Sequence, residues 1–149
     1  MPGFSCNGMD ELTLSLEQLA TTPEETQFRM LEAGAAVLMA KWKEVLQGMK
    51  RSKQLLDSIK TKRKTGGDGG PVVLVTPNGT RKSEYRGIRK TKAAGKYKKT
   101  NAEVAYVLEY GTPRMDATHW METTNEEASD SVVAAEAAVW DEHLKSLNL

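Results

Sequence analysis

The sequence predicts an α+β fold in which long helices near both ends of the chain pack on a small antiparallel sheet or hairpin. Two helical stripes of apolar residues, one in each half of the chain, predict the long helices. A short apolar run that leads into a Pro-Asn-Gly turn predicts the hairpin. At 149 residues, with 39% hydrophobic side chains, the chain is expected to form a single domain over residues 1–149 with a modest core.

The first long helix is expected to follow Thr22. Before it, LTLSLEQLA (12–20) alternates leucines with polar residues, as strands do. Thr22 is expected to be the N-cap and Pro23 the first helical residue, with Glu25 completing a capping box. Apolar residues then recur every three or four positions, which predicts one continuous buried stripe: Phe28, Leu31, Ala35, Leu38, Trp42, Val45 and Met49.

A second stripe near the C terminus supplies the packing partner, because its residues are spaced four, three, four and three: Val133, Ala137, Trp140, Leu144 and Leu147. We expect the two stripes to form the main core, chiefly through Phe28, Leu31, Leu38, Trp42, Val45, Val133, Trp140 and Leu144. After Gly48, SKQLLDSIKTK predicts a shorter helix with Ser52 as a cap. Leu55, Leu56 and Ile59 would lie on its inner face.

The middle of the chain predicts a hairpin between loops. TGGDGGP (65–71) is typical of a flexible joint. Val72–Val75 predicts a strand, Pro77-Asn78-Gly79 a turn, and the residues through Tyr85 the returning strand. The following stretch, KTKAAGKYKKTNA (90–102), has no apolar period and predicts a mobile loop. We expect the basic segments 60–71 and 86–101 to be mobile in the free monomer and to become ordered on assembly.

Charge is strongly segregated, although the net charge is only +1. Residues 1–49 carry three basic and seven acidic side chains, residues 50–99 carry sixteen and three, and residues 100–149 carry two and ten. Such segregation predicts charged partners, or a basic face that the acidic helices of the same molecule balance. The candidate contacts with a protein partner or DNA are Arg81, Lys82, Arg86, Arg89, Lys90, Lys92, Lys96, Lys98 and Lys99.

Motifs for catalysis or ligand binding are not found. Cys6 is the only cysteine, and the two histidines, His119 and His143, have no metal-site spacing. TGGDGGP has no Gly-Lys-Ser/Thr ending and precedes a predicted strand, so it is not a P-loop. The longest apolar run, Ala33–Ala40, is too short to cross a bilayer. We therefore expect no enzyme activity, cofactor, metal, small-molecule substrate or membrane association.

The segment AEVAYVLEYGTPRMDATHWM (102–121) places one carboxylate in an apolar cluster, then a stiff turn, then a tryptophan. It resembles the small tail-component proteins of long-tailed bacteriophages, also called tail-completion or neck proteins. In that family a Tyr-Ala-x-x-Val-Glu-x-Gly-Thr run is followed by a Met, an Ala and an aromatic residue. The matching positions here are Ala105-Tyr106 (in reversed order), Leu108-Glu109, Gly111-Thr112, Met115, Ala117 and Trp120. The order of strand, long helix, short helix, hairpin, motif and last helix also agrees.

The resemblance implies a non-enzymatic virion protein, made in the host bacterial cytoplasm and assembled as a homo-oligomeric ring, such as a hexamer, at the head–tail junction. Its partners would be further copies of itself, other neck and tail proteins and DNA in the channel. The alternative function is sequence-independent nucleic-acid binding through the basic segment 81–99, in which Tyr85 and Tyr97 could stack on bases.

The motif also suggests a role for Glu109. We expect its carboxylate to accept hydrogen bonds from the backbone N–H groups of the Gly111–Met115 turn, or to pair with a basic group of a neighbouring subunit. Either contact would set the angle between the hairpin and the last helix, with Trp120 as the hydrophobic anchor. The alternative is a plain turn with Glu109 facing solvent. The motif comprises Glu109, Tyr110, Gly111, Thr112, Pro113, Met115 and Trp120.

Overall fold

The structure is a computed structural model that describes residues 13, 15–18, 20–49, 53–80 and 100–148. The elements of this part are α2 (Glu24–Gly48), α3 (Lys53–Ser58), β1 (Ile59–Thr65), β2 (Pro71–Pro77), α4 (Asn101–Tyr110) and α5 (Trp120–Ser146). Two long helices and a two-stranded antiparallel sheet confirm the predicted α+β class.

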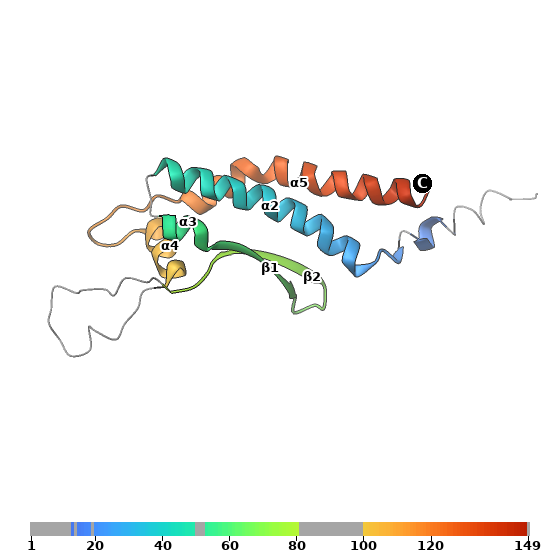
Figure 1. Cartoon of the computed structure of the whole chain (residues 1–149), viewed down its shortest axis with the longest axis horizontal. Coiled ribbons are helices and arrows are strands. Elements are labelled where there is room, and N and C mark those ends of the chain that lie inside the picture. Colours follow the sequence, from blue (N-terminus) through green and yellow to red (C-terminus); the bar gives the residue numbers. More distant parts are fainter. Residues whose placement is uncertain (1–12, 14, 19, 50–52, 81–99, 149) are drawn as a thin grey trace, which may run out of the picture.

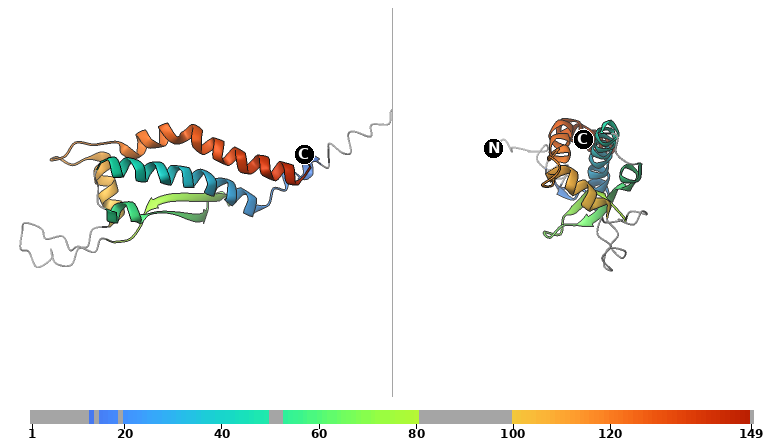
Figure 2. Two further views of the ribbon diagram at one scale, coloured as in Figure 1. Left: turned by 45° about the horizontal axis from the view of Figure 1, so that its top comes forward. Right: turned by 90° about the vertical axis from the view of Figure 1, so that its left-hand side faces the viewer.

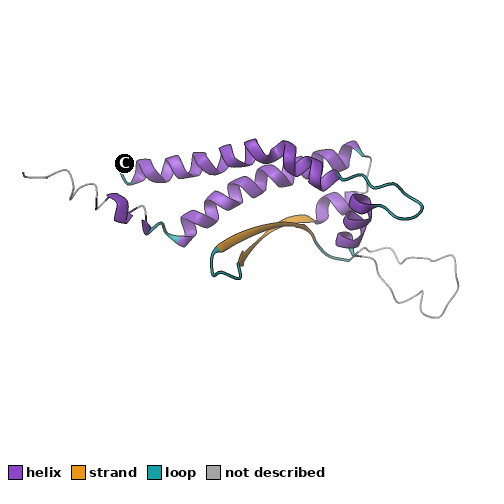
Figure 3. Cartoon of the chain, turned by 180° about the vertical axis from the view of Figure 1, so that it is seen from behind, coloured by secondary structure: helices purple, strands orange, loops and turns teal. Residues whose placement is uncertain are grey.

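Helix α2 is the central element of an elongated arrangement. It runs antiparallel to α5 along most of its length, and the hairpin of β1 and β2 lies along another side of α2 (Figure 1). The short helices α3 and α4 lie near the end where α5 begins (Figure 2). Seen from behind, the hairpin again follows α2 (Figure 3). Helix α5 and the hairpin therefore form separate surfaces of the molecule, on different sides of α2.

The start of α2 differs from the prediction. Pro23 occupies the N-cap position with φ −58° and ψ 140°, and no side chain caps the helix, so the predicted Thr22 cap is wrong. The extended ψ of Pro23 delays the helix by one residue, and its carbonyl accepts the N–H groups of Thr26 and Gln27 at 2.9 and 3.2 Å. Residues 15–18 are helical, so the strand predicted there is wrong as well. A helix satisfies its backbone locally, whereas a strand needs a neighbouring strand.

The hairpin that the structure describes lies one strand earlier in the sequence than the predicted one, whose returning strand through Tyr85 falls mostly outside the described residues. Strand β1 pairs with β2 from Ile59 opposite Pro77 to Thr65 opposite Pro71. The connecting turn is the glycine-rich segment 66–70, where Gly66 donates to Gly70 at 2.7 Å and Gly69 has φ +83°. Segment 60–71 is thus a paired strand and its turn, and the prediction that it is mobile is wrong. The alternating basic residues of β1 resemble a solvated loop in sequence because one of its faces is exposed.

The close approach of α2 to α5 depends on Gly34. A Cβ atom at Gly34 would lie 2.5 Å from Oε1 of Glu136 and 2.9 Å from Cγ1 of Val132. Ala35 and Ala128 are also buried. Small side chains therefore let these two helix backbones approach each other.

The main core lies at the end of the molecule where the short helices meet α2 and α5. Its buried cluster is Trp42, Leu46, Leu55, Ile59, Ala105, Leu108 and Trp120. Ile59 begins β1 rather than extending the short helix. None of the described helices combines the length and apolarity that a membrane span requires.

The predicted core residues divide into three groups. Trp42 is buried as predicted. Val133 is 62% exposed, so its assignment to the core is wrong. The face of α5 toward α2 contains smaller residues, with Thr124 and Ala128 buried and Val132 half-buried, and Val133 lies about 100° around the helix from Val132. The remaining residues are half-buried: Phe28, Leu31, Leu38, Val45, Trp140 and Leu144. Leu38 and Val45 pack against the cluster.

Candidate functional site

The junction between α4 and α5 centres on the buried carboxylate of Glu109, which is 3% exposed. Its two oxygens accept the backbone N–H groups of Met121 at 2.7 Å and Glu122 at 3.2 Å. These are the second and third residues of α5, whose N–H groups have no partner within the helix. His119, at the N-cap position, makes no side-chain cap. Glu109 therefore caps α5 from a different helix, and its negative charge suits the helix dipole.

The predicted donors to Glu109 were wrong, because the Gly111–Met115 turn satisfies its own backbone. Thr112 N–H donates to the Met115 carbonyl at 2.8 Å, and Met115 N–H donates back at 3.0 Å. The start of a helix offers free N–H groups, whereas this closed turn offers few. The solvent-facing alternative is also wrong, since Glu109 is buried.

The backbone between the two helices folds back onto the end of α4. Gly111 ends α4 with φ +77°, and a Cβ atom there would lie 2.6 Å from the Met115 carbonyl oxygen and 2.7 Å from the Ala117 nitrogen. Thr118 N–H donates to the Leu108 carbonyl at 3.0 Å, and His119 N–H donates to the Glu109 carbonyl at 3.1 Å. The end of α4 thereby obtains partners for its carbonyls and supplies a cap to α5.

Trp120 anchors this junction in the core, as the sequence predicted. It is 3% exposed, and its ring meets Trp42 of α2 edge to face, with centroids 5.3 Å apart and an interplanar angle of 72°. Its indole Nε1–H donates to the Ala105 carbonyl at 3.4 Å, and that of Trp42 donates to Asn125 Oδ1 at 2.8 Å. The first turn of α5 is thus attached to both α4 and α2.

The other motif residues form the outer side of the junction. Tyr106 and Tyr110 are 61% and 60% exposed, and their ring centroids lie 4.6 Å apart. They are outside the core, so only part of the apolar cluster expected around Glu109 is buried. Thr112 and Pro113 are exposed, and Met115 packs against the core.

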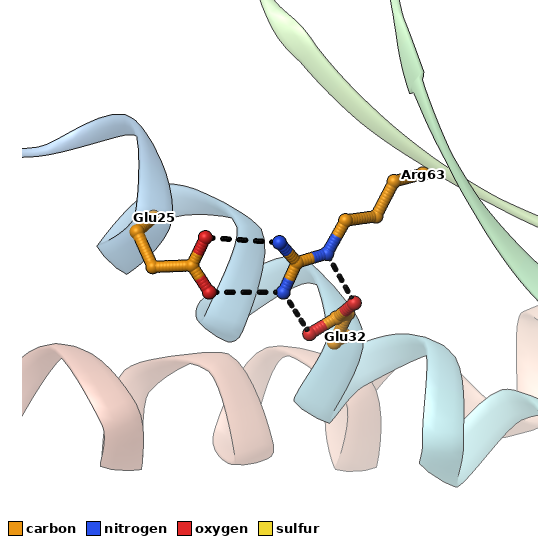
Figure 4. Close-up of polar contacts among 3 residues, drawn as sticks. All are labelled: Glu25, Glu32 and Arg63. Carbon is orange, nitrogen blue, oxygen red and sulfur yellow. Dashed lines mark hydrogen bonds and ion pairs between the residues drawn. The ribbon is translucent and has the colours of Figure 1, made fainter.

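A second polar centre joins the hairpin to α2 and was not predicted from the sequence. The Arg63 guanidinium bonds to both oxygens of Glu25 at 2.9 and 3.0 Å and to both oxygens of Glu32 at 2.6 and 2.9 Å (Figure 4). It also lies 4.9 Å from the centre of the Phe28 ring. The hydrogen bonds from Arg63 lower the pKa of each carboxyl, and the two carboxylates raise the pKa of Arg63. A Glu-x-x-Phe-x-x-x-Glu face on a helix is the only sequence signal for this clamp.

The junction also brings together groups that can ligate metals. Ligand atoms of Glu109, His119 and Glu122 lie within 4.8 Å of one another, although the histidine and Glu122 are exposed. Both oxygens of Glu109 already accept N–H groups at the positive end of α5. The arrangement thus provides for helix capping, and the adjacent dipole disfavours a cation.

The predicted basic contacts lie outside the described residues. This applies to Arg81, Lys82, Arg86, Arg89, Lys90, Lys92, Lys96, Lys98 and Lys99, and to Tyr85 and Tyr97. Of the basic residues between α3 and residue 80, all four belong to β1: Lys60, Lys62, Arg63 and Lys64.

Comparison with known proteins identifies a family. The HK97-gp10-like family model, whose description reads "Bacteriophage HK97-gp10, putative tail-component", matches residues 10–111. The match includes α2, the hairpin and α4, and it ends at Gly111 of the motif. No curated protein and no solved structure matches the chain.

Proposed function

The chain belongs to the HK97 gp10-like family of bacteriophage tail components, and we propose that it forms a ring of identical subunits at the head–tail junction. A tail component is a structural part of the virion. The ring would join or complete the tail by contacts with its own copies and with neighbouring neck and tail proteins. It would act by assembly and not by catalysis.

The observation that supports a ring is the placement of opposite charges on separate surfaces. Helix α5 carries seven acidic side chains and one lysine, while residues 59–77 carry four basic side chains and one acidic. The two surfaces belong to different elements that flank α2 (Figure 2). Identical subunits that meet through unlike surfaces make a repeating contact, which closes into a ring when the rotation permits.

The internal contacts support a role as a preformed building block. Arg63 ties the hairpin to α2, and Glu109 ties α4 to α5. Both contacts hold the surfaces at defined positions before assembly, which reduces the entropy lost on binding. The chemistry around Glu109 also favours assembly over catalysis, because its carboxylate oxygens are engaged by backbone donors.

The proposal is tested by deleting the gene from the phage and examining lysates by electron microscopy. We expect DNA-filled heads and tails that fail to join or to complete, and we expect the chain supplied from a plasmid to restore infectious particles. Labelling of a tagged, functional chain should mark the head–tail junction. Normal joined particles from the deletion phage, or labelling confined to another part of the tail, would overturn the proposed position.

A further inference from the structure

We propose that the outer face of the hairpin of one copy docks on the outer face of α5 of the next copy. The lysine face consists of Lys60, Lys62, Lys64 and Leu74. The acidic face consists of Glu126, Asp130, Val133 and Asp141. This inference rests on the proposed ring and names the surfaces through which its subunits would meet.

The lysine face follows from the alternation of side chains along β1. Arg63 points to α2, where it bonds to Glu25 and Glu32, so its neighbours Lys62 and Lys64 point to the opposite face of the sheet. Lys60 lies on that same face, and all three lysines are exposed. Leu74 is directly opposite Lys62 in the register and is 36% exposed. The face is therefore a row of positive charges beside an apolar side chain.

The acidic face follows from the helical positions of its members. Glu126, Asp130, Val133 and Asp141 lie within about 80° of one another around α5. All four are exposed, and Val133 is 62% exposed. Among the ion pairs of the described residues, the acidic partner on α5 toward α2 is Glu142, which lies 3.5 Å from Arg29. Glu126, Asp130 and Asp141 take part in no ion pair among the described residues, so their exposed carboxylates are accessible to a partner.

The two faces match in charge and in apolar content. The three lysines extend over about 13 Å at the rise of a strand. Glu126 to Val133 extends over about 10 Å at the rise of a helix, and Asp141 lies about 12 Å further along the helix. Each face has one exposed aliphatic residue beside its charges, Leu74 or Val133, so docking would bury an apolar contact as well as pair charges. Apolar burial matters here because exposed ion pairs contribute little individually.

Charge also determines the direction of assembly. A two-fold contact centred on one of the faces would place like charges against each other, and they would repel. A two-fold contact that paired both faces at once would need them on one side of the molecule, whereas they lie on different elements that flank α2 (Figure 2). A head-to-tail contact pairs opposite charges and leaves one face of each kind free for the next copy. The occupant that the structure favours is therefore a second copy of this chain.

Cysteine cross-linking can test the contact. In a Cys6→Ser background, Lys62→Cys and Asp130→Cys are introduced together, and a short bis-maleimide is added to purified virions and to concentrated purified chain. A ladder of dimers, trimers and higher multimers is expected, because each copy would carry both halves of the contact. The matched control combines Lys62→Cys with Ser131→Cys, which is exposed on α5 but about 90–100° away from Asp130. Each single-cysteine variant is a further control.

The outcomes separate this inference from the proposed function. If the chain is present in virions and the Lys62/Asp130 pair gives no ladder, the docking faces are wrong while the tail location stands. Equal ladders from the Ser131 control would also overturn the assignment, and so would dimers from Lys62→Cys alone. If virions lack the chain, the proposed function fails, and the ladder in purified chain decides the contact by itself.

Charge reversal gives an independent result. In the Lys62→Cys, Asp130→Cys chain, changing Lys60 and Lys64 to Glu, or Glu126 and Asp141 to Lys, is expected to abolish the ladder. In the chain without introduced cysteines, the same changes are expected to abolish the rescue of the deletion phage. Making both sets of changes in one chain restores complementarity, so the ladder and the rescue are expected to return. Failure of the combined variant, with unchanged circular dichroism, would overturn the pairing. If the lysines contacted DNA instead, the lysine reversal would remain defective in the combined variant.

Discussion

The Glu109 carboxylate lies 2.7 Å from the amide nitrogen of Met121, so α4 supplies the cap that α5 lacks in its own sequence. Helices are usually capped by the residue that precedes them. Here His119 holds that position with φ 48° and makes no side-chain cap. The cap consequently depends on the packing of two helices, and its loss is expected to affect tertiary structure as well as one helix end.

Replacing Glu109 tests this cap. Glu109→Ala should lower the free energy of unfolding by about 1–3 kcal/mol, because it leaves buried N–H groups without acceptors. Glu109→Gln keeps one acceptor oxygen and should lose less. Chemical denaturation followed by circular dichroism measures both, with the exposed Glu127→Ala as the control. If Glu109→Ala unfolded at the same denaturant concentration as the parent, the cap would contribute nothing to stability.

Gly111 should not tolerate a side chain. Gly111→Ala requires φ +77° and places a Cβ atom 2.6 Å from a backbone carbonyl oxygen, so we expect a loss on the order of 2–3 kcal/mol. Gly79→Ala, at φ +80° with its Cβ in ordinary contact 3.9 Å from Nδ2 of Asn101, tests the backbone conformation alone. Gly67→Ala, in open space and without a positive φ, should change little. A similar loss for Gly111 and Gly79 would mean that the close approach is unimportant.

Replacing Trp42 or Trp120 should destabilise the protein more than replacing Trp140. Trp42→Ala and Trp120→Ala should each cost about 3–5 kcal/mol, because both rings are buried against each other. Trp140→Ala should cost less, since Trp140 is only half-buried. Thermal melts of the three variants rank their losses of stability. An equal loss at Trp140 would place the main core along the whole length of α2 and α5.

Arg63 should not be replaceable by Lys. Arg63→Lys keeps the charge but loses the paired contacts with Glu25 and Glu32, so the melting temperature should fall. The matched control, Lys62→Arg, lies on the opposite face and should leave the melt unchanged. A melt of Arg63→Lys identical to that of the parent would show that the geometry of the clamp is unimportant.

The same clamp should make stability depend on pH. The folded protein lowers the pKa of Glu25 and Glu32, so the unfolded chain binds more protons in the acidic range. The clamp therefore contributes its full stabilisation above about pH 4.3, the ordinary pKa of glutamate. This stabilisation is lost as the pH falls through the lowered pKa values of Glu25 and Glu32 in the folded protein. The difference in melting temperature between the parent and Arg63→Met should shrink in that range. A difference independent of pH would exclude the ion pairs as its source.

Elements with local signals could be predicted from the amino-acid sequence. The three-and-four spacing after Thr22 predicted a long helix, and α2 extends from Glu24 to Gly48. Gly111 and Pro113 predicted the break after α4, because glycine permits positive φ and proline lacks an N–H. The family motif around Glu109 and the burial of Trp120 were also evident at this level. Such features depend on a residue and its near neighbours along the chain.

Contacts between residues far apart in the sequence depend on packing and could not be predicted from local patterns. Strand β1 resembled a basic loop until its pairing with β2 and the contact of Arg63 with α2 showed that one face is covered. Val133 matched the helical period but is exposed, because the interface of α2 and α5 is closed by smaller residues such as Gly34 and Ala128. Glu109 looked like an acceptor for its own turn and instead caps α5. Helical periodicity predicts that a side chain lies on a face of the helix that can be buried. Tertiary packing determines which residues bury that face.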